Sequence, residues 1–142
     1  MSAHPERDET SNIAIIDGSN VAYSTEGEPP HVANILAVRD KLVSENLEPI
    51  VVADAALRHQ IDDAARYEQL IDDGIVRQAP AGTDADYFIL SFARGLKASI
   101  VSNDRFRDRI KQFPEAKGRM IRYMILNQEV VLERRTHRRN GE

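Results

Sequence analysis

The 142-residue sequence contains no cysteine. Disulfide bonds, a thiolate nucleophile and a cysteine-based zinc finger are therefore excluded from these residues. Ser19 and Ser24 have no evident base partner, so a serine nucleophile is unsupported. Histidine is also sparse and lacks the spacing of metal ligands, which argues against a zinc site. The four histidines are His4, His31, His59 and His137.

Long hydrophobic runs are absent as well. The longest apolar stretches, Ile13–Ile16 and Ile50–Ala53, are far too short to span a bilayer. Met1–Ser11 is polar and charged, so we expect neither a signal peptide nor a transit peptide. Together with the lack of cysteine, these features favour a cytoplasmic protein with no membrane partner.

The composition is that of a soluble globular protein. Hydrophobic residues make up 42% and charged residues 30%, and 142 residues suffice for one domain with a substantial core. The net charge is −4, but the charges are unevenly distributed. Acids gather between residues 62 and 86, whereas bases gather at 105–111 and 134–139. Such a protein can still bind a polyanion at its basic patches.

Apolar runs and helical spacing alternate along the chain. We predict strands at Ile13–Asp17, Ile50–Ala53, Ile75–Ala79, Ser99–Ser102, Met120–Ile125 and Glu129–Leu132. We predict helices at His31–Asn46, Leu57–Asp73, Asp84–Lys97 and Asn103–Gln112. This alternation with short connections predicts an α/β fold with a mainly parallel sheet flanked by helices, although the pairing of the last two strands stays open. We expect a flexible N-terminus (1–12), one domain (13–133) and a basic flexible tail (134–142).

Acidic residues follow the predicted strands. The run Ile13–Ile16 ends in Asp17-Gly18-Ser19-Asn20, and the second strand ends in Asp54. In open α/β sheets, ligands bind outside the carboxyl ends of the strands. Asp17 with Asn20 can hold a cation or a polarised water there. The alternative is that Asp-Gly is an ordinary turn and that Asn20 caps a helix.

Two later junctions also carry acids. Asp84 and Asp86 begin one predicted helix, and Asp104 and Asp108 lie four residues apart in the next, which would place both on one helix face. Each acid alone can be a cap or a surface charge. Taken together, four acids at one edge of a sheet are harder to explain as caps; they are Asp17, one of Asp84 and Asp86, Asp104 and Asp108. Mg²⁺ and Mn²⁺ favour such oxygen ligands, and the site suits phosphoryl chemistry.

Three motifs resemble the NYN branch of the PIN-domain nucleases, and most of all the Regnase (MCPIP-type) ribonuclease domain. They are Asp17-Gly18-Ser19-Asn20-Val21-Ala22, Asp86-Tyr87-Phe88-Ile89-Leu90 and Ser102-Asn103-Asp104-Arg105-Phe106-Arg107-Asp108. The resemblance extends from about residue 13 to 133. It implies a PIN-like three-layer sandwich and a metal-dependent endoribonuclease that uses Mg²⁺ or Mn²⁺.

The resemblance also implies site residues. Asp17, Asn20, Asp86, Asp104 and Asp108 match its catalytic positions, and the four acids among them match its metal ligands. The Regnase branch often has two adjacent acids at the middle motif, whereas Ala85 stands here, which leaves the role of Asp84 open. Asp54 is a further candidate acid.

We therefore predict hydrolysis of an RNA phosphodiester by a metal-activated water. Arg58, Arg105 and Arg107 are candidate phosphate contacts, because guanidinium groups match phosphate oxygens in pairs; the alternative is that they form exposed ion pairs. The rival functions are a catalytically inactive RNA-binding or assembly module and a Mg²⁺-dependent phosphatase. A homodimer is a further expectation.

Overall fold

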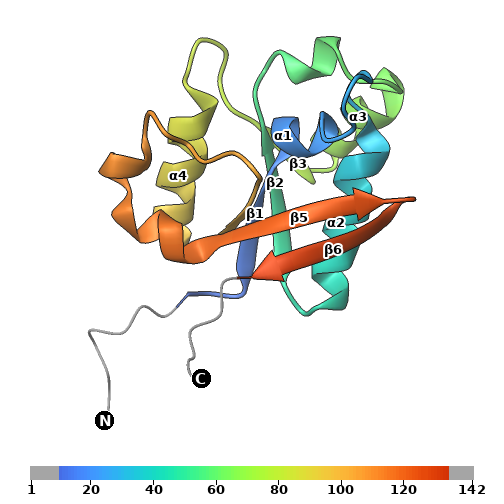
Figure 1. Cartoon of the computed structure of the whole chain (residues 1–142). Helices are drawn as coiled ribbons and strands as arrows, with labels where there is room; N and C mark the ends of the chain where they lie inside the picture. Colours follow the sequence, from blue (N-terminus) through green and yellow to red (C-terminus); the bar gives the residue numbers. More distant parts are fainter. Residues whose placement is uncertain (1–9, 135–142) are drawn as a thin grey trace.

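A six-stranded sheet forms the centre of the structure, a computed structural model that describes residues 10–134. The strand order is β3-β2-β1-β4-β5-β6; the first five strands in this order are parallel, and β6 pairs antiparallel to β5 (Figure 1). The strands are β1 (Ile13–Asp17), β2 (Glu48–Ala53), β3 (Val76–Gln78), β4 (Ser99–Val101), β5 (Met120–Leu126) and β6 (Glu129–Arg134). The predicted mainly parallel sheet is confirmed, and the last two strands form a hairpin.

Both faces of the central strands are buried, which explains their continuous apolar runs. Successive residues of a strand point to opposite faces. Ile16 and Val51 accordingly belong to one core cluster, whereas their neighbours Ile15 and Val52 belong to a second cluster across the sheet. The fold therefore needs helices on both faces.

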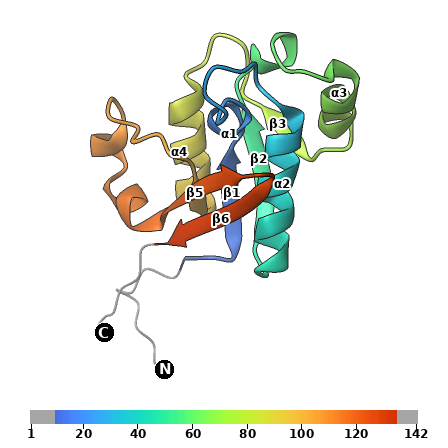
Figure 2. The same cartoon turned by 45° about the vertical axis from the view of Figure 1, so that its right-hand side comes forward.

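The helices are α1 (Gly18–Ala22), α2 (Val32–Ser44), α3 (Ala64–Asp72) and α4 (Ala85–Leu96). Val21, Val38 and Tyr67 bring α1, α2 and α3 into the first cluster, whereas Leu90 of α4 lies in the second. Figure 2 shows α4 on one side of the sheet and α2 and α3 on the other. These layers confirm the predicted sandwich of helices around a sheet.

The predicted helix at 57–73 is wrong in its first half. Leu57–His59 is a short 3₁₀ turn (η1), and α3 begins only at Ala64. Asp63 has a left-handed φ of 41°, and its side chain accepts a hydrogen bond from the Arg66 N–H as the cap of α3. A left-handed residue interrupts a helix, so the periodic apolar residues of this segment belong to two separate elements.

The predicted helix at 103–112 is wrong throughout most of its length. The chain forms a loop after β4, followed by the 3₁₀ turns η2 (Ile110–Gln112) and η3 (Pro114–Arg119). Asp104 Oδ1 accepts a 2.6 Å hydrogen bond from the Phe106 N–H, and Phe106 adopts a φ of 51° with only 1% of its surface exposed. Burial of the Phe106 ring favours this left-handed turn over a helix. Asp104 and Asp108 therefore do not share a helix face.

Residues 11 and 12 continue the chain of β1 at its N-terminal end with backbone hydrogen bonds to both sides. The Ser11 N–H donates to the Lys97 carbonyl oxygen at 2.7 Å, and the Glu48 N–H donates to the Asn12 carbonyl oxygen at 2.8 Å. The rest of the predicted flexible N-terminus (1–9) and most of the predicted basic tail (135–142) lie outside the described residues. Within 10–134, no helix is both long enough and apolar enough to cross a membrane.

Candidate functional site

Asp17 ends β1 with a side chain that is only 6% exposed. Its Oδ2 accepts a 2.8 Å hydrogen bond from Ser102 Oγ, and its Oδ1 accepts a 3.4 Å bond from the Asn20 N–H as the cap of α1. Gly18 lies tight against β2, since a Cβ there would come within 3.0 Å of the Val52 carbonyl oxygen. The Asp-Gly pair is thus a close strand-to-helix turn that holds a buried carboxylate at the carboxyl edge of the sheet.

Burial raises the pKa of the Asp17 carboxyl to about 6, because the charged form loses its hydration. Hydrogen bonds from Ser102 and from the Asn20 backbone lower this pKa, whereas the negative charges of Asp86 and Asp104 raise it. A nearby cation would stabilise the charged carboxylate. Strongly perturbed acids of this kind are typical of functional sites.

Two more acids reach the same place from other elements. Asp86 lies in the first turn of α4, half-buried, and burial followed by the charge of Asp104 raises its pKa. Asp104 lies in the loop after β4. We call their common pocket, of about 480 Å³, the acid pocket; it is lined by Asp17, Ser19, Asn20, Tyr23, Ser24, Asp86, Asn103, Asp104 and Tyr123. Four of the five predicted catalytic residues therefore meet in one place.

Asn20 is held rigidly in this pocket. Its Oδ1 accepts hydrogen bonds from the Tyr123 hydroxyl at 2.7 Å and from the Asn103 N–H at 3.0 Å. Asn103 in turn pairs with the backbone of Tyr123, donating through Nδ2 at 3.0 Å and accepting through Oδ1 at 3.1 Å. Burial raises the pKa of Tyr123, so its hydroxyl remains a donor. These contacts join α1, the loop after β4 and the middle of β5.

The sequence patterns predict no role in the site for Ser102, Asn103 or Tyr123. Ser102 and Asn103 directly precede Asp104 in the third motif, and this proximity was an available signal. Tyr123 carried no such signal. It reaches Asn20, 103 residues earlier in the chain, only because β5 pairs with β4.

Three predicted acids lie outside the lining of the acid pocket. Asp84 caps α4, and its Oδ2 accepts a 2.6 Å hydrogen bond from Arg109 Nε, which lowers the pKa of Asp84. Asp54 accepts from Ser19 Oγ and from the Leu57 N–H, both at 2.9 Å. Asp108 is exposed, and its charge contributes to the raised pKa of Asp86. Asp84 and Asp54 thus have structural partners.

The three arginines predicted to contact phosphate also lie in different places. Arg58 binds both carboxylate oxygens of Glu68, through Nε at 2.8 Å and Nη2 at 2.6 Å. Arg105 and Arg107 follow Asp104 in the same loop but line a different pocket. The ion-pair alternative therefore holds for Arg58, whereas Arg105 and Arg107 remain phosphate-contact candidates.

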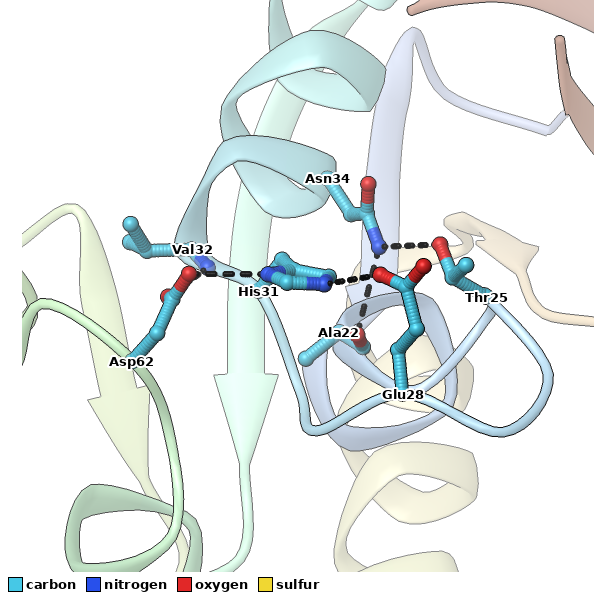
Figure 3. A network of polar contacts seen from close by, with 7 residues as sticks. All are labelled: Ala22, Thr25, Glu28, His31, Val32, Asn34 and Asp62. Atoms are coloured by element: carbon cyan, nitrogen blue, oxygen red, sulfur yellow. Dashed lines mark hydrogen bonds and ion pairs between the residues drawn. The ribbon is translucent and has the colours of Figure 1, made fainter.

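A polar network holds the loop that follows α1 (Figure 3). His31 lies between two carboxylates, with Nδ1 2.8 Å from Asp62 Oδ2 and Nε2 2.7 Å from Glu28 Oε1. Hydrogen bonds to Asp62 and then Glu28 raise the pKa of His31. The network anchors the segment that begins with Tyr23 and Ser24, both of which line the acid pocket.

The chemistry of these acids suits a divalent cation better than their spacing does. Within residues 10–134, no three carboxylate or histidine side chains lie close enough together to hold a metal ion. Asp17, Asp86 and Asp104 nevertheless share one pocket, and the two whose pKa is raised repel each other's charge. Mg²⁺ retains several waters and binds through one or two carboxylates. The donor set therefore fits a hydrated ion of the Mg²⁺ or Mn²⁺ type.

The fold and the pocket define an α/β protein with an acidic site at the carboxyl edge of a parallel sheet. The sequence model of the Zc3h12a-like ribonuclease NYN domain matches residues 10–142. The chain belongs to this family of ribonuclease domains, and this membership supports an RNA-cleaving nuclease at family level. The resemblance seen in the motifs is thereby confirmed; the PIN domain is related but different.

Solved structures with the same fold include two of nuclear protein-only RNase P 2 from Arabidopsis thaliana. One has a TM-score of 0.70 at 24% identity, the other 0.69 at 25% identity. Each alignment covers 85% of this chain but only 29% of the longer one. The chain thus corresponds to less than a third of those proteins. No curated protein matches the chain by sequence.

Proposed function

We propose that this domain is a metal-dependent endoribonuclease that hydrolyses RNA phosphodiester bonds through a metal-activated water. The observation that supports this is the meeting of Asp17, Asp86 and Asp104 in one pocket, together with Asn20. These residues come from β1, α4, the loop after β4 and α1, so the pocket depends on the whole fold. Family membership independently points to RNA cleavage.

In this proposal, Asp17, Asp86 and Asp104 would hold the hydrated cation, some of them directly and the others through its coordinated waters, and Asp108 adds negative charge near Asp86. Bound Mg²⁺ or Mn²⁺ would lower the pKa of a coordinated water and neutralise charge on the phosphoryl group. Asn20 orients a water or a phosphate oxygen, since its carboxamide is fixed by two hydrogen bonds.

Arg105 and Arg107 contact the RNA backbone in this proposal, whereas Arg58 is left out because Glu68 occupies its guanidinium. Asp54 and Asp84 are supporting residues rather than ligands in this proposal, since neither lines the acid pocket. The homodimer and the cytoplasmic location stay predictions from the sequence.

The test is cleavage of a circular RNA by wild type and by Asp104→Asn, with Mg²⁺, Mn²⁺ or EDTA. Asparagine keeps the oxygen that accepts from the Phe106 N–H, so the loop should survive the change. We expect the wild type to cut only with metal, and the variant to lose at least about 100-fold in rate, the usual effect of removing one electrostatic contact. Asp40→Asn, an exposed acid of α2, is the matched control.

Each rival function has its own outcome in this assay. A phosphatase releases phosphate from a small substrate and leaves circular RNA intact. An inactive module binds the RNA and cuts nothing under any condition. If Asp104→Asn stays within a few-fold of wild type and retains its melting temperature, the assigned site is wrong.

A further inference from the structure

A second pocket, of about 670 Å³, is lined in part by Arg105 and Arg107 of the loop that carries Asp104. Seven residues of the described range 10–134 line it, of which four are cationic and one is acidic, and we call it the basic pocket. It is lined by Arg105, Arg107, Ile110, Lys117, Met120, Arg122 and Glu133. In a chain with a net charge of −4, such a local surplus of cations needs an explanation.

The basic pocket and the acid pocket share a wall. Asn103 and Asp104 line the acid pocket, and the next residue, Arg105, lines the basic pocket. Arg122 fastens this wall to β5, because its Nη1 donates to the carbonyl oxygens of Ser102 and Asp104, each at 2.8 Å. The relative position of the two pockets is therefore fixed by the fold.

The lining of the basic pocket suits a phosphate group. A guanidinium group such as that of Arg107 can donate hydrogen bonds to two phosphate oxygens at once, and Lys117 supplies a point charge. Ile110 and Met120 add an apolar surface to the pocket. In a cleft with such low-dielectric walls, the positive potential of the cations is stronger than on an open surface, which favours binding of an anion. Glu133, the one carboxylate among the lining residues that the structure describes, is exposed and lies opposite Arg122 on the neighbouring strand.

We propose that the basic pocket binds a backbone phosphate of the same RNA strand whose scissile phosphodiester lies in the acid pocket. This inference rests on the proposed function, which places that phosphodiester on the other side of the 103–105 wall. The strand then crosses the wall, with one phosphate at the acids and a neighbouring phosphate at the cations. The basic pocket thereby sets the register of cleavage and requires RNA that extends past the cut bond.

The first test measures RNA affinity in EDTA, so that it does not depend on cleavage. The probe is a short unstructured RNA, titrated by fluorescence anisotropy at several salt concentrations. The variant Arg107→Gln/Lys117→Gln removes two cations from the basic pocket. The control Arg66→Gln/Lys41→Gln removes the same two residue types from the distant pocket beside α2 and α3. Thermal melts of all proteins confirm that each remains folded.

Each phosphate contact on single-stranded RNA contributes a slope of about −0.7 in log K against log salt. Losing two contacts should make the slope less negative by about 1.4. Between 50 and 200 mM salt, wild type should then lose about sevenfold more affinity than the variant. The control should retain the wild-type slope. Equal slopes for the two variants, or no RNA binding by wild type, would overturn the proposal.

The second test locates the phosphate. Methylphosphonate linkages, which lack the charge, are introduced one at a time into the RNA. We expect one position beside the cut bond to weaken wild-type binding and to have no further effect on the Arg107→Gln/Lys117→Gln variant. Should only a 5′-terminal phosphate show this coupling, the pocket binds strand ends and the proposal is wrong.

The two proposals fail separately. A slope change without any cleavage by wild type refutes the nuclease assignment and keeps the basic pocket as a phosphate site. Metal-dependent cleavage with unchanged slopes refutes the basic pocket and keeps the nuclease assignment.

Discussion

Replacing Asp17 with asparagine should stabilise the metal-free domain at neutral pH. The folded-state pKa of Asp17 is raised from 3.8 to about 6, so ionisation is easier in the unfolded chain. The fold bears no penalty at a pH below the unfolded pKa; the penalty grows as pH rises towards 6 and is complete at pH 7. At about 1.4 kcal/mol per pKa unit, it amounts to roughly 3 kcal/mol.

The gain is reduced by what asparagine loses. The carboxylate accepts from Ser102 Oγ and from the Asn20 N–H, whereas a carboxamide offers only one oxygen. One lost hydrogen bond costs about 1 kcal/mol, which leaves a net gain of roughly 2 kcal/mol at pH 7. For a domain of this size, that raises Tm by roughly 6–8 °C. At about pH 4 the charge penalty fades, and the variant should be no more stable than wild type.

Thermal melts at both pH values, in EDTA and in Mn²⁺, test this reasoning. Metal at about a hundredfold over its Kd should stabilise wild type by roughly 2.7 kcal/mol, and Asp17→Asn should lose most of that gain. Asp40→Asn, which changes an exposed acid of α2, should behave as wild type throughout. The reasoning is refuted if Asp17→Asn melts lower at both pH values yet keeps the full Mn²⁺ shift, since Asp17 is then only a helix cap.

Three further changes have defined outcomes. Arg58→Gln should alter stability by less than about 1 kcal/mol, because its ion pair with Glu68 is exposed, and should leave RNA affinity measured by anisotropy unchanged. Tyr123→Phe should lower kcat in the cleavage assay more than it raises KM, because it removes a hydrogen bond that holds the Asn20 carboxamide without removing a ligand. His31→Gln should lower Tm more at about pH 6 than at about pH 9, because hydrogen bonds to Asp62 and Glu28 raise the pKa of His31 and stabilise its charged form, a contribution lost as pH rises through that pKa.

The sequence alone determined the sheet and the edge at which the site lies. Ile13–Ile16 followed by Asp17 has the apolar continuity of a strand buried on both faces, and Ile50–Ala53 followed by Asp54 repeats that pattern after a helix-length interval. Parallel strands linked by helices bring their carboxyl ends to one edge of the sheet. The meeting of Asp17, Asp86 and Asp104 therefore follows from chain order and hydrophobic pattern, both of which are local properties.

Tertiary structure decided which polar residues have structural partners. The spacing of Asp104 and Asp108 is compatible with a helix, but burial of the Phe106 ring turns the chain into a loop. From the sequence, Arg58 was a plausible phosphate contact, but in the fold α3 places Glu68 against its guanidinium group. Ser102 reaches Asp17 across 85 residues of sequence. Such contacts depend on how distant segments pack, because the energy of a buried ring or an ion pair is set by neighbours that local periodicity does not encode.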